Sequence, residues 1–415
     1  MNNLLRQIWQ KNLMRIKQVF FISLDFLLYC CLPTPEIDLS SSSDKRLVLF
    51  LGDSLQARIP RMAKWLQRKG NYSCVLMTAQ GKGFQIFNTE IFSEVLSYRS
   101  SWDLKRKLKG LKGVDLIHAF TIPSLPIKIA IDHADSPVIM DMQDMYVSYF
   151  GLKSPKLYMR LDMPNEAYSI RNAHGLVSHS IELINACKEY EIEQRPPTLF
   201  FPVYADEDYA IEPEEIKPLD EIHIVYAGSI AGSFQDDQHF GSMKLFWLIE
   251  EFARQRIHFH IYPSPNMRFR DLILSEYHKI EAENPYFHMH ESVKQDQLAK
   301  ELGQYSFGLL PFFLEDTSRT FNKLGRGSSQ KLYNYMEAAI PVIISEDLAF
   351  QAWMAGRYGG GVKVNKKDFY QMREIIEGID YVERRKEILK NREKVFLGAN
   401  IPRLIDFYEE ILAKG

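Results

Sequence analysis

The sequence has few cysteines and no large excess of charge, and each absence excludes a class of protein. Its 415 residues include four cysteines, Cys30, Cys31, Cys74 and Cys187, with no Cys-x-x-Cys pair. This set offers neither a disulfide framework nor a zinc knuckle, and it is typical of a reducing compartment. Lysine and arginine total 51 against 53 acidic residues, a net charge of −2 that excludes a globally basic nucleic-acid-binding protein. We therefore expect a cytoplasmic protein that does not bind nucleic acid.

Several catalytic and membrane signatures are also missing. The sequence contains neither a Gly-x-x-x-x-Gly-Lys-Ser loop nor a Gly-x-Ser-x-Gly elbow, which counts against an NTPase and an α/β-hydrolase. The apolar stretch Val19–Leu32 is shorter than the about 20 apolar residues of a membrane-spanning helix. Pro33-Thr34-Pro35, which follows it, does not resemble a signal-peptide cleavage site. We expect neither a transmembrane segment nor a cleaved signal.

Two basic segments lie in the first third of the chain. Residues 1–17 hold Arg6, Lys11, Arg15 and Lys17 with no acid. Two interpretations remain open for this end: an amphipathic helix on an anionic membrane, or a helix packed on the protein's own core. Residues 99–112 hold six basic residues and one acid, and a solvated helix face is the ordinary explanation of such a segment. Two such segments in one half of an acidic chain favour contact with anionic lipid, on the inner face of the cell membrane.

Apolar runs alternate with segments of helical spacing, which is typical of a parallel sheet covered by helices on both faces. Leu47–Leu51, for example, is a continuous apolar run of the kind that forms a strand buried on both faces. The other expected strands are Tyr72–Met77, Val114–Ala119, Pro137–Met140, Leu199–Val203, Ile222–Tyr226, Ile257–Tyr262, Phe287–His290, Phe307–Leu310 and Pro341–Ile344. The expected helices are Ile59–Lys69, Ile181–Glu191, Lys244–Gln255, Gln297–Leu302, Lys331–Ala339 and Pro402–Leu412.

The strand and helix series is interrupted once, by an acidic, proline-bearing stretch that we take as the interdomain linker. The pattern predicts an α/β protein with two doubly wound parallel sheets facing each other across a cleft, since open α/β sheets bind ligands at the carboxyl ends of their strands. We divide the chain into a basic helical segment with its linker (1–44), an amino-terminal domain (45–205), the interdomain linker (206–220), a carboxy-terminal domain (221–395) and a final helix (396–415). We expect this final helix to pack back on the amino-terminal domain.

A turn of small residues precedes the helix expected at Lys331–Ala339. Gly327-Ser328-Ser329 gives free backbone N–H groups at the positive end of a helix, an arrangement that holds a phosphate, and Arg326 and Lys331 add charge. Lys331, Asn334 and Tyr335 are three and four residues apart, so they are expected to share one side of the helix. The alternative is a capped core helix with a solvated lysine.

Together with the Pro341-Val342-Ile343 strand, this stretch resembles the GT-B glycosyltransferases of the family-four type. In that family a Ser/Gly turn and a helix of the form Lys-x-x-Glu-Tyr-x-x-x-Gly-x-Pro-Val hold the diphosphate and ribose of a nucleotide sugar. Further similar segments are Asp115–Phe120, Pro137–Asp144, Val177–Ser180, Val225–Ser229 and Phe307–Pro311, in matching order. The resemblance covers most of residues 46–415. It implies two Rossmann-like domains and retaining transfer of a sugar from a nucleoside-diphosphate sugar to a saccharide or lipid-linked acceptor, with no required metal or other cofactor.

The resemblance also implies roles for particular residues. The donor-binding residues would be Gly228, Ser229, Ser328, Ser329, Lys331, Asn334 and Tyr335. Lys331 and Arg326 would stabilise the charge that develops on the leaving diphosphate. Asp144, His118 and Asp141 are candidates for activating the acceptor hydroxyl, although a buried strand-end polar group is an equal alternative for each. The chain departs from the family at Asn334 and Arg326, where the family has acidic residues, at Ile340 in place of Gly, and at Gln143, where many relatives have His.

Three function classes remain open on the sequence alone: a glycosyltransferase of bacterial-type cell-surface polysaccharide or glycolipid synthesis, a GT-B sugar-nucleotide epimerase, and a catalytically silent binding or scaffold protein.

Two other features of the sequence could suggest a metal site but have ordinary explanations. Asp236-Asp237 is typical of a polar loop rather than a metal site. His258-x-His260 and His288-x-His290 lie on expected strands, where alternate residues share a face and could hold a metal, although half-exposed strand histidines are commoner.

Overall fold

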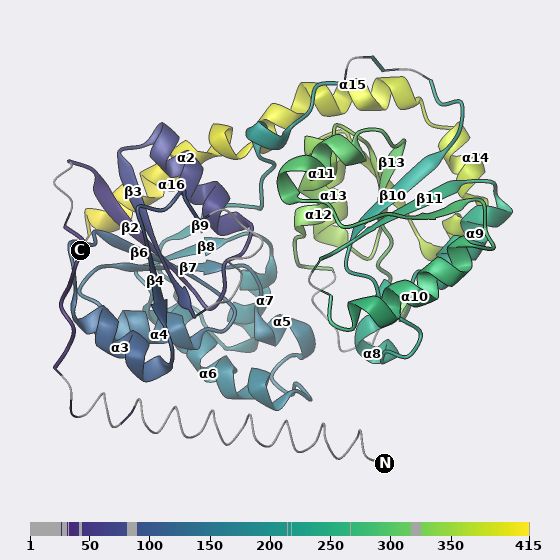
Figure 1. Ribbon diagram of the computed structural model, residues 1–415. Coiled ribbons are helices and arrows are strands. Elements are labelled where there is room, and N and C mark those ends of the chain that lie inside the picture. Colours follow the sequence, from purple (N-terminus) through teal and green to yellow (C-terminus); the bar gives the residue numbers. More distant parts are fainter. Residues whose placement is uncertain are drawn as a thin grey trace, which may run out of the picture.

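The chain forms two α/β domains that lie side by side, each built on one sheet with helices around it (Figure 1). In the computed structural model the described residues are Phe26, Cys31, 33–40, 44–80, 89–213, 215–216, 218–265, 267–316 and 325–414. The predicted basic helix at the amino terminus lies outside these residues. Among the described helices, none is both long enough and apolar enough to cross a bilayer.

The first sheet has seven parallel strands in the order β4-β3-β2-β6-β7-β8-β9. Their bounds are β2 (Arg46–Gly52), β3 (Tyr72–Ala79), β4 (Glu94–Tyr98), β6 (Leu116–Phe120), β7 (Val138–Met142), β8 (Gly175–Ser178) and β9 (Thr198–Phe200). The helices of this domain are α2 (Arg58–Lys69), α3 (Ser101–Lys109), α4 (Leu125–His133), α5 (Tyr146–Phe150), α6 (Leu157–Asn172) and α7 (Glu182–Glu189). A two-stranded sheet joins β1 (Ile37–Asp38) to β5 (Leu111–Lys112).

The second sheet has six parallel strands in the order β12-β11-β10-β13-β14-β15. Their bounds are β10 (His223–Gly228), β11 (His258–Pro263), β12 (Phe287–Met289), β13 (Phe307–Leu310), β14 (Val342–Ser345) and β15 (Gly361–Val364). The helices are α8 (Asp237–Phe240), α9 (Phe246–Arg254), α10 (Arg270–Glu281), α11 (Gln295–Leu302), α12 (Gln330–Glu337), α13 (Ala349–Arg357), α14 (Met372–Glu377) and α15 (Tyr381–Asn391). The strand order reverses between β10 and β13, which is where open sheets of this kind bind ligands. The predicted α/β fold class with two parallel sheets is confirmed.

The last helix, α16 (Leu397–Leu412), returns to the first domain and packs against α2 (Figure 1). It begins five residues before Pro402, where the apolar spacing placed its start, and so falls within the predicted final helix of residues 396–415. The carboxylate of Glu207 accepts the N–H groups of Gly398 and Ala399 at 3.0 and 3.1 Å, which satisfies donors that a helix start leaves unpaired. With its first turn capped in this way, the helix begins at Leu397 and includes Pro402.

The acidic stretch after Phe200 is bound to both domains rather than extended in solvent. Asp206 and Asp208 accept hydrogen bonds from Lys64 of α2 at 2.7 and 2.8 Å, and Asp208 also pairs with Arg68. Arg61 of α2 pairs across the two domains with Glu337 of α12 at 2.6 Å, with both side chains buried. These contacts couple α2, the stretch around residue 206 and α12.

The second predicted basic segment contains α3 and β5. Lys107 donates to the carbonyl oxygen of Ser97, and Lys112 pairs with Glu36. The contact of this segment with anionic lipid stays a prediction.

Candidate active site

Lys331 lies over the end of β10, at the switch point of the second sheet. A methyl group on Gly228, the last residue of β10, would come within 2.1 Å of Lys331 Cε and 3.2 Å of its Nζ. The Lys331 ammonium lies 6.0 Å from the ring centre of Tyr226 and 5.5 Å from that of Phe312, which follows β13. Because residue 228 is a glycine, the Lys331 ammonium of α12 can lie over the end of β10, where the sheet is expected to bind a ligand.

The turn before α12 lies at this same edge, because α12 crosses from β13 to β14 and begins at the carboxyl ends of the strands. Ser329 caps the helix, and its hydroxyl accepts the N–H of Lys331 at 3.3 Å. Arg326, Ser328 and Ser329 are all partly exposed in this turn, and Ser229 follows Gly228 across from it. The positive helix end, Lys331 and Arg326 together favour an anion such as a diphosphate.

Lys331 and Tyr335 both lie on the side of α12 that faces β10, but Tyr335 and Asn334 are buried whereas Lys331 is partly exposed. Tyr335 is fully buried, and its hydroxyl donates to the carbonyl oxygen of Val225 or Leu309, at 3.3 and 3.1 Å. Lys331, in the first turn, lies over Gly228 at the end of β10, whereas Tyr335 lies one turn deeper, against Val225 of the same strand. Tyr335 therefore fixes α12 on β10 and β13 and is not placed to contact a nucleotide.

The Asn334 side chain is 6% exposed, and its Oδ1 accepts from Gln295 at 3.1 Å and from Gln330 at 3.3 Å. Asn334, which stands where the family has a carboxylate, is therefore part of a local network of amide side chains. The assignment of Ile340 to the family's Gly is wrong, because in that motif the Gly lies eight residues after the Lys, which is Ala339, and Ala339 has the left-handed φ of +52°. Ile340 is 1% exposed and packs in the core.

His118 and Asp141 belong to a buried network in the first domain. His118 Nε2 lies 3.1 Å from Asp141 Oδ2, and its Nδ1 lies 2.5 Å from the hydroxyl of Tyr408 on α16. Arg58 Nε donates to the same Asp141 oxygen at 3.0 Å. Burial alone would raise the pKa of Asp141, but Arg58 and His118 hold that pKa below its usual value, while burial lowers the pKa of His118.

Both side chains are 0% exposed. Because a general base must come within hydrogen-bond distance of the proton it removes, this burial favours the structural alternative for both residues over acceptor activation. We assign them instead to the attachment of α16 to the sheet. Sequence analysis gave no signal for this role, since Arg58 and Tyr408 come from distant parts of the chain.

Of the three residues predicted to activate the sugar acceptor, Asp144 is partly exposed. Its loop, at the carboxyl end of β7, is held by buried side chains that accept backbone hydrogen bonds. Thr121 Oγ1 accepts the N–H groups of Gln143 and Asp144 at 3.0 and 3.3 Å. Glu166 accepts those of Tyr146 and Val147 at 2.7 and 3.2 Å, at the start of α5. Thr121 and Glu166 were missed by sequence analysis, because nothing local marks a residue that orders a neighbouring loop.

Glu166 is expected to make folding stability depend on pH. Burial raises the pKa of Glu166 from 4.5 to about 7, although the Tyr190 hydroxyl and two backbone N–H groups oppose this shift. The folded state therefore binds a proton that the unfolded state releases, so this stabilisation is complete below about pH 4.5 and is lost as pH rises through about 7. The shift corresponds to roughly 3 kcal/mol.

Glu166→Gln should therefore be less sensitive to pH than the wild type when unfolding free energy is measured by urea denaturation at pH 5 and pH 8. Glu193→Gln, on the exposed loop after α7, is the matched control and should keep the wild-type dependence. Parallel pH dependences for the wild type and Glu166→Gln would contradict the assignment.

Comparison with known proteins identifies the architecture. No family model matches the sequence, and no curated protein matches it. Among solved structures, HepE from Anabaena in complex with UDP and glucose has a TM-score of 0.62 at 12% identity, over 88% of this chain and 99% of that one. Sucrose-phosphate synthase from Thermosynechococcus elongatus has a TM-score of 0.61 at 11% identity, over 89% of this chain and 100% of that one.

A trehalose 6-phosphate synthase from Burkholderia multivorans is similar to the same degree, with a TM-score of 0.60 at 12% identity, over 89% of this chain and 97% of that one. The chain has the GT-B fold. In the GT-B chain described here, Lys331 and the start of α12 lie in the second domain, and Asp144 lies in the first.

Proposed function

We propose that this GT-B protein is a glycosyltransferase that moves a sugar from a nucleoside-diphosphate sugar to an acceptor hydroxyl. The observation that carries the proposal is the position of Lys331 over Gly228, at the start of α12 and at the switch point of the second sheet. The similarity to HepE, whose structures hold UDP-glucose or UDP and glucose, and to sucrose-phosphate synthase supports it at the level of the fold.

In this mechanism the acceptor oxygen bonds to the anomeric carbon of the donor sugar on the same face from which the diphosphate departs, as the bond from that carbon to the diphosphate breaks, so that the configuration is retained. Negative charge grows on the departing diphosphate, and Lys331, Arg326 and the N–H groups at the start of α12 stabilise it. Asp144 orients the acceptor hydroxyl and accepts its proton. Retention of configuration and transfer of a hexose are part of the proposal, and it requires no metal or other cofactor.

A panel of UDP, GDP, ADP and CMP sugars tests the proposal, with melting temperature and donor turnover as readouts. A nucleotide that binds only the folded state raises its melting temperature. Transfer or slow hydrolysis of the donor is the expected result. Release of an epimerised sugar would favour an epimerase, and binding without turnover would favour a scaffold protein; either result contradicts the proposal.

An exposed apolar and basic patch supports a lipid-linked acceptor, and we call it the α6 patch. Leu152, Leu157, Tyr158 and Leu161 are 50%, 60%, 58% and 68% exposed, respectively. Lys153, Lys156 and Arg160 lie among them. The segment follows α5 directly, and α5 begins two residues after Asp144. Apolar side chains interspersed with cations are suited to an anionic membrane surface.

We therefore propose a peripheral location on the inner face of the cell membrane, where the acceptor of cell-surface polysaccharide or glycolipid synthesis would be presented beside Asp144. Leu157→Asp/Leu161→Asp is expected to weaken binding of the protein to anionic vesicles by roughly tenfold or more, because two aliphatic side chains no longer enter the lipid.

Co-sedimentation at low salt measures the effect. Leu272→Asp is the matched control, since Leu272 is also exposed, at 53%, but lies on α10 of the second domain. Binding of the α6 variant at the wild-type level would contradict membrane docking by this patch.

A further inference from the structure

Five of the eleven histidines lie together on one face of the second sheet, away from the site described above. They are His223, His258, His260, His288 and His290, on β10, on β11, and on β12 and the residue that follows it. The strand register sets His223 beside His258 and His260 beside His288, and alternate residues of a strand share a face. His223 is the first residue of β10 and Gly228 the last, so the end of this cluster formed by His223 and His258 lies at the opposite end of β10 from Lys331.

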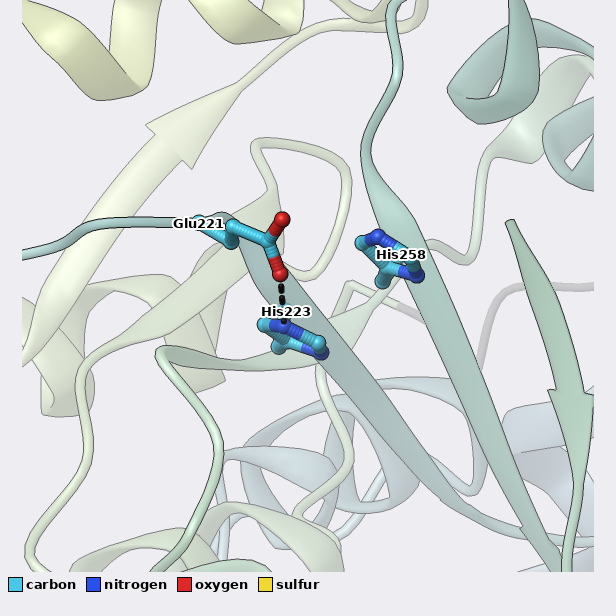
Figure 2. A group of neighbouring side chains, drawn as sticks. All are labelled: Glu221, His223 and His258. Atoms are coloured by element: carbon cyan, nitrogen blue, oxygen red, sulfur yellow. Dashed lines mark ion pairs between the residues drawn. The ribbon is translucent and has the colours of Figure 1, made fainter. Parts of the chain in front are cut away.

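Three side chains at the outer end of this cluster have the composition of a metal site. One possible ligand atom from each of Glu221, His223 and His258 lies within 4.8 Å of the other two. In Figure 2 the Glu221 carboxylate turns toward His223, and His258 lies beside them on the neighbouring strand; Glu221 Oε2 is 3.5 Å from His223 Nε2. The Glu221 and His223 side chains are 72% and 33% exposed, which gives an ion access from solvent.

The second nitrogen of each of these two histidines is held by another histidine. His223 Nδ1 lies 3.0 Å from His260 Nε2, and His258 Nδ1 lies 3.0 Å from His288 Nε2. The chain of contacts continues from His260 Nδ1 to His290 Nε2 at 2.9 Å. Metal-binding histidines usually donate their other N–H to a carboxylate, a backbone carbonyl or water, and here a histidine nitrogen occupies that position.

Two opposite sets of tautomers satisfy these contacts, and one of them leaves ligand atoms for a metal ion. If each Nδ1 carries the proton, His223 donates to His260, His260 donates to His290, and His258 donates to His288. The Nε2 lone pairs of His223 and His258 then remain for a metal ion.

We propose that Glu221, His223 and His258 bind a divalent transition-metal ion of the zinc class, through one carboxylate oxygen and the two Nε2 atoms, with water in the fourth position. Two imidazoles and a carboxylate are a typical zinc set, whereas magnesium and calcium select oxygen ligands. Zinc ligand distances bring the three ligand atoms to roughly 3.3 Å from one another, which requires side-chain rotation at this solvent-accessible edge. The ion would fasten the end of the interdomain stretch, at Glu221, to β11.

The test uses the full-length protein with any affinity tag removed and with metal stripped by a chelator. Calorimetric titration with Zn²⁺ should show one site per chain, and saturation should raise the melting temperature by roughly 2 °C or more, whereas Mg²⁺ should not. Co²⁺ should give the visible absorption of a four-coordinate nitrogen and oxygen site without a thiolate band.

His258→Phe keeps the ring stacking and should weaken Zn²⁺ binding at least tenfold, and Glu221→Gln should weaken it by a smaller factor. His278→Phe removes one member of an exposed pair, His278 and Glu281, whose atoms lie 2.9 Å apart on α10, and it should bind Zn²⁺ like the wild type. Absence of a stoichiometric site in the wild type, or equal affinity in the wild type and His258→Phe, would overturn the proposal. Because these readouts do not use donor turnover, their failure is separate from failure of the glycosyltransferase proposal.

Discussion

Lys331→Ala should lower the kcat of donor turnover by about 10²- to 10³-fold, the loss typical of one group that stabilises an oxyanion in a transition state. The ammonium lies over Gly228, where charge on a departing diphosphate would grow, so its loss affects the transition state more than the bound substrate. Steady-state kinetics with the donor found by the nucleotide panel measure the effect. Lys363→Ala, on β15 of the same domain, is the matched control and should keep wild-type kinetics.

Gly228→Ala tests the same geometry from the other side. Gly228 has φ +153°, and a methyl group there would meet Lys331 Cε at 2.1 Å, so the lysine must move. We expect a loss of turnover comparable to that in Lys331→Ala, and little further loss in the double variant, because both changes remove the same interaction. Wild-type turnover in a folded Lys331→Ala protein, or fully additive losses in the double variant, would contradict the role of Lys331.

Arg61→Ala should lower the unfolding free energy by about 3–5 kcal/mol, because it leaves the Glu337 carboxylate buried without its cation. Arg61 and Glu337 connect α2 to α12 at 2.6 Å, and the same Glu337 oxygen accepts the N–H of Asp206 at 2.8 Å. Burial raises the pKa of Glu337 above its usual value in spite of Arg61, so desolvation outweighs the attraction. Removing one partner therefore costs more unfolding free energy than the intact ion pair contributes when it is compared with an apolar pair at the same two positions.

Arg61→Met/Glu337→Leu should for this reason recover most of the stability lost in Arg61→Ala. Urea denaturation of the three proteins measures the difference. Arg68→Ala, on the exposed face of the same helix, should cost about 1 kcal/mol or less, since its pair with Asp208 is only partly buried. A double variant less stable than Arg61→Ala would show that the charges themselves stabilise the contact between domains.

The sheets could be predicted from the sequence because their strands are buried on both faces and appear as apolar runs. Leu47–Leu51 and Val342–Ile344 show this directly. β4 was not predicted, since this edge strand is largely exposed and its residues Glu94–Tyr98 mix polar and apolar types. α6 was not predicted because exposed leucines, such as Leu157 and Leu161, remove the apolar periodicity that marks a helix.

The candidate site was predicted only in part, for a different reason. Spacing along α12 groups Lys331 with Tyr335, and both lie against β10, but Tyr335 is enclosed between α12 and the sheet whereas Lys331 reaches the partly exposed end of the strand. His118 lies in the middle of β6 and Asp141 near the end of β7, and only the return of α16, with Tyr408, shows that both are enclosed. Such long-range contacts leave no local pattern in the sequence.

A crystal structure of the protein with bound UDP or GDP, chosen by the nucleotide panel, tests the central claim most directly. We predict that the diphosphate lies at the start of α12, in contact with Lys331 Nζ and the N–H groups that follow Ser329. A diphosphate bound elsewhere, with Lys331 still over Gly228 and out of contact with it, would contradict the account.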